Sequence, residues 1–472
     1  MTTPFNFLPH TDADREAMLR VIGASSQAEL FSDIPTSLRE NIRYCTLPES
    51  GLSELELQQH LKDWAKENTG ASYASFLGGG AYHRFIPPVV NTIAGRSEFY
   101  TAYTPYQPEI SQGTLQYTYE FQTMICELTG MDVANASVYD GGSAVTEAAL
   151  MAIRSTKGNT VLAADSINPE YRAVLETYLN TLEGITLKAF NLESLPQVLA
   201  SYDPKQLAAI VVQQPNYFGC VEALDTVREY CQAQKTFFIV AAEPFSLALL
   251  EAPGHYGADV VVGDIQPLGN NLSFGGPYGG YMATKEKHMR QLPGRLVGRT
   301  LDKNQRPCYT LTLQTREQHI KRERATSNIC TNQALNILKA TVYLTLVGPS
   351  GLRYLSDLSA QRAHWLSEQL SAINGVSLLF PEKPFLNEFS VQLPVPAELA
   401  LHALEKASIL GGIALARFYP DKPNSLLISC TEMTPPDQLK RYVDVLKNLL
   451  DKPNKVQPKN TTGGSKSLLN TL

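Results

Sequence analysis

The sequence lacks the short motifs that mark metal and dinucleotide sites. Its 472 residues include seven cysteines, but these form no Cys-x-x-Cys pair, and no histidine stands near them at the spacing of a zinc site. We therefore expect no bound metal, and we expect the cysteines to be reduced and mostly buried. A G-x-G-x-x-G fingerprint is also missing, which argues against a Rossmann-type dinucleotide site.

The sequence also lacks an excess of positive charge. Lys and Arg total 40 against 46 Asp and Glu, which gives a formal net charge of −6. A nucleic-acid partner is therefore not expected, because neutralising phosphates requires a clear excess of clustered Lys and Arg. The first residues show neither the charged start and apolar stretch of a signal peptide nor a membrane anchor, so we predict no membrane association and a cytoplasmic location.

The composition itself is that of a globular protein, with 43% hydrophobic and 18% charged residues. The chain is too long for a single core. Thr11 and Asp14 form the pattern of a capped helix start. We predict a mainly helical N-terminal segment (1–100), a large α/β domain (101–330), a small α+β domain (331–450) and a polar, disordered tail (451–472).

Short β-branched or apolar runs alternate with amphipathic stretches through the large domain, which is typical of βαβ units and predicts a mainly parallel sheet covered on both faces. The predicted strands there are 136–139, 160–164, 185–190, 207–212, 237–241, 259–262 and 280–283. In the small domain the predicted helices are 334–346, 352–373, 397–407 and 436–450, and the predicted strands are 376–380, 389–393, 413–418 and 425–430.

The strongest local feature is a glycine-containing turn before an Ala-rich helix, Ser137-Val138-Tyr139-Asp140-Gly141-Gly142-Ser143. A strand-to-helix turn of this kind exposes backbone amides that could hold a cofactor phosphate. Alternatively, Gly141, Gly142 and Ser143 only permit a tight turn. The sequence alone leaves both interpretations open.

Two later segments match the places where pyridoxal-phosphate (PLP) enzymes of the aminotransferase fold, fold type I, carry their cofactor-binding side chains. In that fold a carboxylate at a strand end pairs with the pyridine nitrogen, and a lysine slightly later forms the Schiff base. The run 237–243 ends in Glu243, where Asp is more usual. The segment 259–280 contains no lysine, and Gln266 stands in that region. A glutamine amide cannot form the aldimine, because that bond requires a nucleophilic amine.

The nearest lysines, Lys285 and Lys287, follow the predicted strand at 280–283 and are expected to be solvated surface residues. The missing lysine therefore favours a subunit that works with a partner chain over a self-sufficient enzyme.

Two loops rich in aromatic, amide and hydroxyl groups are candidates for a binding surface. They span 100–113 and 76–88, and prolines fix an extended path in the first. Either could instead be packed between domains. A third stretch, 316–324, is basic with interleaved acids at helical spacing, which predicts a solvated helix or linker with internal ion pairs.

These segments together resemble the glycine cleavage system P-protein family (glycine dehydrogenase, aminomethyl-transferring), in its split form with separate α and β subunits. The resemblance covers most of the chain and weakens before Pro4 and after Asp451. It rests on three runs: Phe76-Leu77-Gly78 with Tyr82-His83 and Ile86-Pro87-Pro88; Tyr103-Thr104-Pro105-Tyr106-Gln107-Pro108-Glu109-Ile110-Ser111-Gln112-Gly113-Thr114-Leu115-Gln116; and Leu313-Gln314-Thr315-Arg316-Glu317-Gln318-His319-Ile320 with Ala325-Thr326-Ser327-Asn328-Ile329-Cys330-Thr331.

The resemblance implies that this chain is an α subunit, that PLP is held by a lysine of the β subunit, and that the pair forms α2β2. It implies decarboxylation of glycine and transfer of the aminomethyl group to the lipoyl arm of H-protein, the electron acceptor. The active site is then expected at the subunit interface, with a wall formed by Tyr82, His83, Tyr106, Gln107, Glu109, Ser111 and Gln112. Gly141, Gly142, Ser143 and Glu243 are then remnants of a cofactor site.

Two other hypotheses remain open from the sequence alone. The chain could be a non-catalytic scaffold that stabilises the β subunit and docks H-protein. It could also be a self-contained PLP enzyme that uses Lys285 or another lysine.

Overall fold

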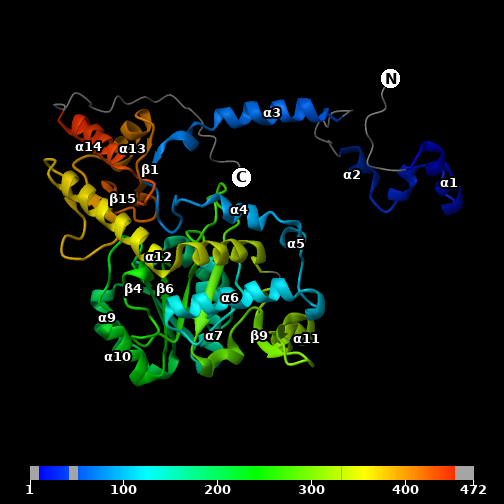
Figure 1. The fold of residues 1–472 in the computed structure, drawn as a ribbon, viewed down its shortest axis with the longest axis horizontal. Helices are drawn as coiled ribbons and strands as arrows, with labels where there is room; N and C mark the ends of the chain where they lie inside the picture. The colour runs from blue at the N-terminus through cyan, green and yellow to red at the C-terminus, as the bar shows by residue number, and fades with distance from the viewer. Residues whose placement is uncertain (1–9, 42–50, 331, 452–472) are drawn as a thin grey trace. The chain divides into compact units, whose positions relative to one another are not determined.

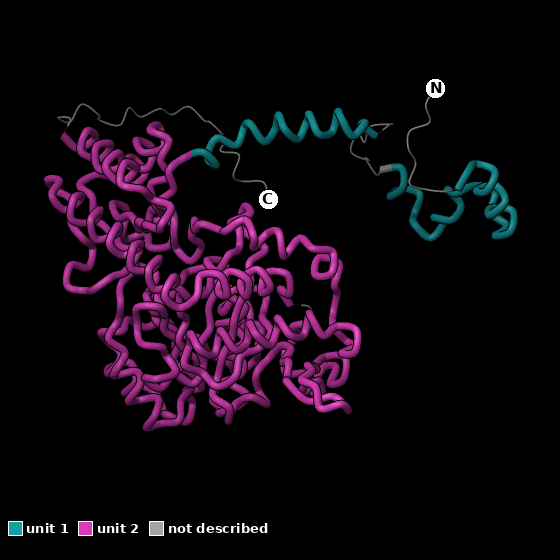
Figure 2. Tube along the Cα trace, in the orientation of Figure 1, with its two compact units in different colours: residues 1–72 teal, residues 73–472 magenta. Residues whose placement is uncertain are grey.

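The computed structural model describes residues 10–41, 51–330 and 332–451. The chain divides into two compact units, Met1–Ser72 and Tyr73–Leu472 (Figure 2). The predicted tail after Asp451 lies outside the described residues. Of the six cysteines in the described ranges, all are free, but only Cys220, Cys231 and Cys430 are buried, so the expectation of mostly buried thiols is only half right.

The first unit is helical where it is described. Its helices are α1 (Asp12–Ile22), α2 (Thr36–Asn41) and α3 (Glu54–Glu67). The predicted cap of α1 is confirmed, because the Asp14 N–H donates to Thr11 Oγ1 at 3.2 Å and the Thr11 N–H donates to Asp14 Oδ2 at 2.8 Å. Ser53 and Glu56 form the same reciprocal cap at the start of α3.

The second unit contains a large α/β domain and a smaller C-terminal domain (Figure 1). Its helices are α4 (Pro88–Ala94), α5 (Ser97–Tyr100), α6 (Gln112–Thr129), α7 (Gly141–Thr156), α8 (Pro169–Leu179), α9 (Leu195–Leu199), α10 (Asp225–Gln234), α11 (Gln318–Lys321), α12 (Ala334–Ser371), α13 (Ala397–Lys406) and α14 (Pro436–Leu450). No helix among the described residues has the length and apolar character needed to cross a membrane.

The central sheet has seven strands in the order β2-β8-β7-β6-β5-β3-β4. Their bounds are β2 (Val133–Ala134), β3 (Thr160–Ala164), β4 (Thr186–Phe190), β5 (Leu207–Gln214), β6 (Phe237–Ala242), β7 (Val260–Asp264) and β8 (Gly280–Thr284). Strands β3 to β7 run parallel, while β8 is antiparallel to β7 and to β2. The predicted mainly parallel sheet is confirmed.

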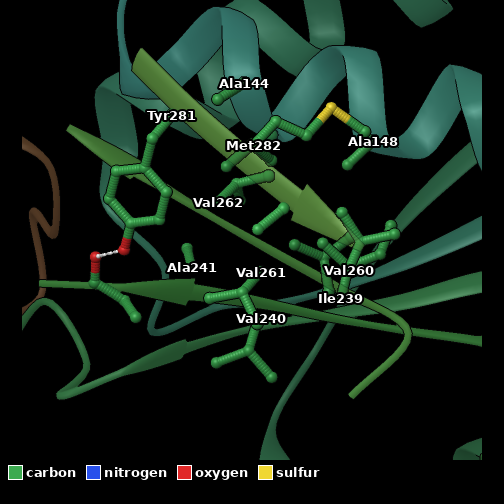
Figure 3. Packing of buried hydrophobic residues seen from close by; sticks show 14 of the residues in the cluster. Ala144, Ala148, Ile239, Val240, Ala241, Val260, Val261, Val262, Tyr281 and Met282 are labelled. Atoms are coloured by element: carbon green, nitrogen blue, oxygen red, sulfur yellow. Dashed lines mark hydrogen bonds between the residues drawn. The ribbon is translucent and has the colours of Figure 1, made fainter. Parts of the chain in front are cut away.

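The core forms where α7 lies across the sheet. Figure 3 shows Ala144 and Ala148 of α7 near Val260 and Met282 on adjacent strands. Small alanines let the helix backbone approach the β-branched strand surface closely, and burial of these strands on both faces explains their continuous apolar sequence. The Oη of Tyr281 donates to the carbonyl of Ala242 at 2.7 Å, which satisfies the only polar atom of that buried ring.

The predicted strand at 136–139 is wrong in extent. Only Val138 pairs with β8, through an isolated bridge to Gly280. Two residues earlier, the N–H of Ala136 donates to the carbonyl of Arg295 at 2.8 Å. The backbone hydrogen bonds of this segment therefore go to β8 and to the Arg295 segment in turn, and no continuous ladder forms.

The smaller domain contains the antiparallel sheet β11-β12-β15-β14. Its strands are β11 (Ser377–Leu378), β12 (Glu388–Gln392), β14 (Ile413–Ala414) and β15 (Ser425–Ser429), while β1 (Ala74–Ser75) pairs in parallel with β13 (Ile409–Leu410). The predicted strand at 413–418 is too long, because the chain turns at Leu415 and buries that side chain in a separate aromatic cluster. The predicted break between two helices is confirmed within α12, where Gly348 is non-helical (φ 64) before Pro349.

The basic stretch differs from its predicted form. Only the four residues of α11 are α-helical, between two 3-10 turns. Arg316 is buried rather than solvated, and its guanidinium donates to the carbonyls of Leu313, Leu292 and Gly294. Its charge serves to hold the end of the antiparallel hairpin β9 (Leu296–Leu301) and β10 (Pro307–Thr312).

Candidate functional site

The carboxyl ends of the parallel strands meet at a cavity of about 470 Å³. This is the edge at which open α/β sheets bind ligands. The N-terminus of α7 lies on one side of the cavity, and the segment Gly78–Ala81 lies on another. A much smaller adjoining cavity reaches Tyr82 and Glu243 and shares Gly80, Asn168, Tyr171 and Asp264 with the first.

The predicted glycine turn forms the start of α7, with Asp140 as its N-cap. The Asp140 carboxylate accepts from the Ser143 N–H at 2.7 Å, and Asp264 Oδ2 accepts from the Gly141 N–H at 3.1 Å. Two of the amides that a phosphate would need are therefore already bound to carboxylates.

Asp264 ends β7 and is buried. Its Oδ1 accepts a second backbone bond, from the Gln266 N–H at 2.7 Å. Burial raises the pKa of Asp264 to about 7, and the nearby Asp140 adds to the rise, while the two backbone N–H groups oppose it. The carboxyl group is thus a structural tie between β7 and α7.

Glu243 follows the end of β6, where the sequence predicted a carboxylate. Its Oε2 accepts from the Ser246 N–H at 2.7 Å, while the buried Oε1 has no hydrogen-bond partner among the described residues. Burial raises the pKa of Glu243, and Arg84 partly opposes that shift.

Gln266 lies in the region where a Schiff-base lysine would be expected. Its Oε1 accepts from the Tyr82 N–H at 2.8 Å, and its Nε2 donates to the carbonyls of Tyr82 at 3.1 Å and Asn270 at 2.9 Å. The side chain is buried, and its amide is fully occupied by backbone groups. Gln266 therefore fixes the segment that carries Tyr82 and His83.

Three further side chains hold the same segment. Glu388 accepts from the Gly79 N–H at 2.7 Å and from Tyr82 Oη at 3.0 Å, and burial raises its pKa to about 7. Thr431 Oγ1 donates to the His83 carbonyl at 2.7 Å, and Glu432 Oε1 accepts from the Phe85 N–H at 2.8 Å. Tyr82 is buried while the side chain of His83 is exposed, beside an open cavity of about 420 Å³.

The second predicted wall segment, 106–112, lies elsewhere in the large domain. The amide of Gln112 binds the Tyr309 backbone of β10, accepting from its N–H and donating to its carbonyl, both at 2.9 Å. Ser111 is half-buried, whereas Tyr106, Gln107 and Glu109 are exposed. Among the described residues, no hydrogen bond, ion pair or ring contact joins this loop to Tyr82 or His83.

The residues at the strand ends do not fit PLP. The charged side chains that line the larger cavity are Asp140, Glu170, Asp264 and Arg417, and no lysine is among the described residues that line it. A phosphate dianion would meet three carboxyl groups and a single guanidinium. Gly141 and Gly142 do form the expected turn, but its geometry favours tight packing over anion binding.

Lys285 and Lys287 also lie far from this edge. Both approach Asp259 Oδ1 at 3.4 Å, and Asp259 immediately precedes β7, whereas Asp264 ends it. Five residues of strand span about 16 Å. Lys285 is therefore at the opposite end of β7 from the cavity.

Sequence reasoning missed Asp264, Tyr171 and Glu388 as site residues. Asp264 could have been found, because it ends an apolar run that was correctly predicted as a strand. Glu388 could not, because its contact with Tyr82 joins positions 306 residues apart. Tyr171 is identified by its packing on Gly141, which only the folded chain reveals.

Comparison with known proteins places these features in a family. The family model described as glycine cleavage system P-protein matches residues 5–446. A probable glycine dehydrogenase (decarboxylating) subunit 1 from Desulforamulus reducens is 47% identical over 430 residues, which cover 90% of this chain and 96% of the relative. Its counterpart from Chloroherpeton thalassium is 46% identical over 450 residues, with 94% and 99% coverage.

Solved structures give the same result. A crystal structure of glycine decarboxylase (P-protein) of the glycine cleavage system, in inhibitor-bound form, superposes with a TM-score of 0.84 at 42% identity, covering 94% of this chain and 100% of that one. An alanine–glyoxylate aminotransferase from Nostoc sp. is similar in fold alone, with a TM-score of 0.55 at 17% identity and coverage of 87% and 99%. The predicted class, a PLP-dependent fold type I large domain with a smaller C-terminal domain, is confirmed.

Proposed function

Because this chain belongs to the glycine cleavage system P-protein family, we propose that it is the α subunit of a split glycine decarboxylase and acts together with a β subunit. The relatives named as subunit 1 match along almost their whole length, which supports a chain of the same extent and role. The expected assembly is α2β2, and the cytoplasm remains the expected compartment.

In this proposal the β subunit holds PLP, which supplies the electron sink for loss of CO2 from glycine. The lipoyl group of H-protein accepts the aminomethyl group. This chain contributes the remaining wall of an active site at the interface, from the exposed His83 and from the loop with Tyr106, Gln107 and Glu109. Half-buried Ser111 belongs to the same wall, and Gln112 anchors it through its hydrogen bonds to the backbone of Tyr309 and Pro108.

The observation that carries this division of labour is the occupied amide of Gln266. In the region where a lysine for the aldehyde of PLP is expected, this chain has Gln266, whose amide donors and acceptor are all used by the backbone of Tyr82 and Asn270. The carboxylates bound at the start of α7 support the same conclusion, because they take the amides of a phosphate site.

The self-contained alternative is disfavoured by the position of Lys285. Its ammonium group lies 3.2 Å from the carbonyl of Gly257 and 3.4 Å from Asp259 Oδ1, at the far end of β7. The scaffold alternative depends on whether the exposed wall contributes to turnover.

Co-expression with a β chain tests the proposal. Glycine-dependent exchange of CO2 should require both chains, and neither should be active alone. In the intact complex, the combined change Tyr106→Ala, Gln107→Ala and Ser111→Ala should lower turnover by about tenfold or more if the loop touches substrate. Glu183→Ala, at an exposed position outside this loop, is the matched control. Unchanged turnover in the triple variant would support the scaffold.

A further inference from the structure

A separate cavity of about 280 Å³ lies between the start of α6, the β9–β10 hairpin and the start of α12. It adjoins the strand-end cavity, with which it shares Pro277 and Gln333. Of the described residues that line it, Arg295 alone carries a charge. The charge that lines this cavity is therefore positive, whereas most of the charges that line the cavity beside it are negative.

The backbone around Arg295 is held firmly in place. The carbonyl of Arg295 accepts from the Ala136 N–H at 2.8 Å. Two residues later, the side-chain amide of Gln122 on α6 accepts from the Val297 N–H and donates to the Val297 carbonyl, both at 2.9 Å. The backbone from which the Arg295 side chain extends is thus fixed.

The backbone of Arg295 is hydrogen-bonded, but its guanidinium lacks hydrogen-bond partners among the described residues. The residue is 6% exposed, and within the described part of the chain its guanidinium makes no hydrogen bond; its buried Nε is an unpaired donor. The nearest carboxylate, Glu317 Oε2, lies 3.9 Å from Nε, and the ring centroid of Tyr106 lies 5.7 Å from Cζ. Arg295 therefore has a long ion pair with Glu317 and a cation–π contact with Tyr106, but neither supplies a hydrogen-bond acceptor to its Nε.

Two other buried arginines have direct hydrogen-bond acceptors, although Nε and Nη2 of Arg84 are also unpaired donors among the described residues. Arg316 donates to three carbonyls, and Arg84 pairs with Glu432 at 2.8 Å. A buried guanidinium without acceptors is unfavourable, because it has lost its hydration without replacement. A ligand that supplies oxygen acceptors would remove this cost.

We propose that this cavity binds a small carboxylate monoanion and that Arg295 is its binding residue. The planar guanidinium matches the two oxygens of a carboxylate. Hydroxyl groups of Tyr103, Thr104 and Thr114 offer further polar contacts, and no acidic side chain among the described lining residues repels an anion. The volume is just below the usual range for ligand pockets, so it suits a ligand of few atoms.

The proposal goes beyond the proposed function, because it requires neither a β subunit nor turnover. The same O–C–O group occurs in glycine, in bicarbonate and in other small acids. No acidic side chain among the described residues that line the cavity would bind the ammonium group of free glycine, so acetate and bicarbonate should bind at least as well as glycine.

Calorimetric titration of the full chain, or of its complex with the β subunit, tests this inference. Acetate, bicarbonate and glycine are titrated at ionic strength matched with chloride. Acetate should bind saturably, and Arg295→Met should weaken it by about tenfold or more, because one charge-assisted pair is lost. Arg299→Met, which removes an exposed charge from the same hairpin, should change it less than twofold, a small effect at an exposed charge. Wild-type affinity in Arg295→Met, or no saturable binding to the wild type, would overturn the inference.

A second variant covers a failure of Arg295→Met to fold. Ala102 lines the cavity but is exposed, so Ala102→Trp should obstruct the cavity without disturbing the core. It should also weaken acetate binding, and unchanged affinity would count against the site. An inactive complex that still binds acetate through Arg295 would overturn the proposed function only. An active complex without acetate binding would overturn this inference only.

Discussion

The side-chain amide of Gln266 pairs with the backbone of Tyr82 at both of its polar ends, at 2.8 Å and 3.1 Å. Only a side chain with a donor and an acceptor can make this pair. A lysine ammonium has three donors and no acceptor, so it could not satisfy the Tyr82 N–H. Gln266 therefore holds the segment that carries Tyr82 and His83, in the region where the sequence led us to expect a cofactor amine.

Gln266→Ala should destabilise the chain by about 2–4 kcal/mol, because it leaves buried N–H and carbonyl groups of Tyr82 unpaired. Gln107→Ala is the matched control, since Gln107 is exposed and should change stability by less than about 0.5 kcal/mol. Urea unfolding of both variants measures the difference. Equal stability of the two variants would show that the amide pair is unimportant.

Gly141→Ala and Gly142→Ala should differ sharply although they are adjacent on α7. A Cβ at Gly141 would lie 2.5 Å from Cζ of Tyr171, whereas a Cβ at Gly142 would meet Val174 Cγ2 at 3.1 Å. We expect Gly141→Ala to cost about 1–3 kcal/mol through overpacking. Gly142→Ala should cost clearly less. Thermal unfolding of the pair checks this order, and the reverse order would refute the packing account of the turn.

Glu388→Gln should change how stability depends on pH. The folded pKa of Glu388, about 7, lies above the ordinary value of 4.5 for a glutamate, so between these pH values the folded chain holds a proton that the unfolded chain has released. Ionisation of Glu388 therefore does not lower the free energy of unfolding below about pH 4.5, and it lowers that free energy progressively as the pH rises towards 7. The free energy of unfolding of the wild type relative to Glu388→Gln should fall by up to about 1.4 kcal/mol per pH unit in this range. A constant difference between pH 5 and 7 would contradict the raised pKa.

The elements that could be predicted from sequence are those with a local cause. The run Val260-Val261-Val262 predicts a buried strand from its own composition, and the cap of α1 follows from two side chains three residues apart. The turn at Gly141 could be predicted from the sequence for the same reason. In each case the deciding interactions lie within one element or its immediate neighbours.

The parts that could not be predicted depend on distant partners. Gln266, Gln122 and Gln112 each bind backbone groups of a remote segment, and a glutamine in a sequence carries no sign of such a contact. Local propensity predicts a strand at 136–139, but the N–H of Ala136 binds the distant carbonyl of Arg295, so the strand does not form over this length. Arg316 lies in a stretch with the pattern of a solvated helix, yet it is buried and donates to three distant or neighbouring carbonyls.

The most direct test of the account is the location of the cofactor in the co-expressed α and β chains. Borohydride reduction would fix PLP as a stable pyridoxyl-lysine, and peptide mass spectrometry would identify the chain that carries it. The account predicts the label on a lysine of the β chain and none on Lys285 or any other lysine of this chain. A pyridoxyl group on one of this chain's own lysines would contradict it.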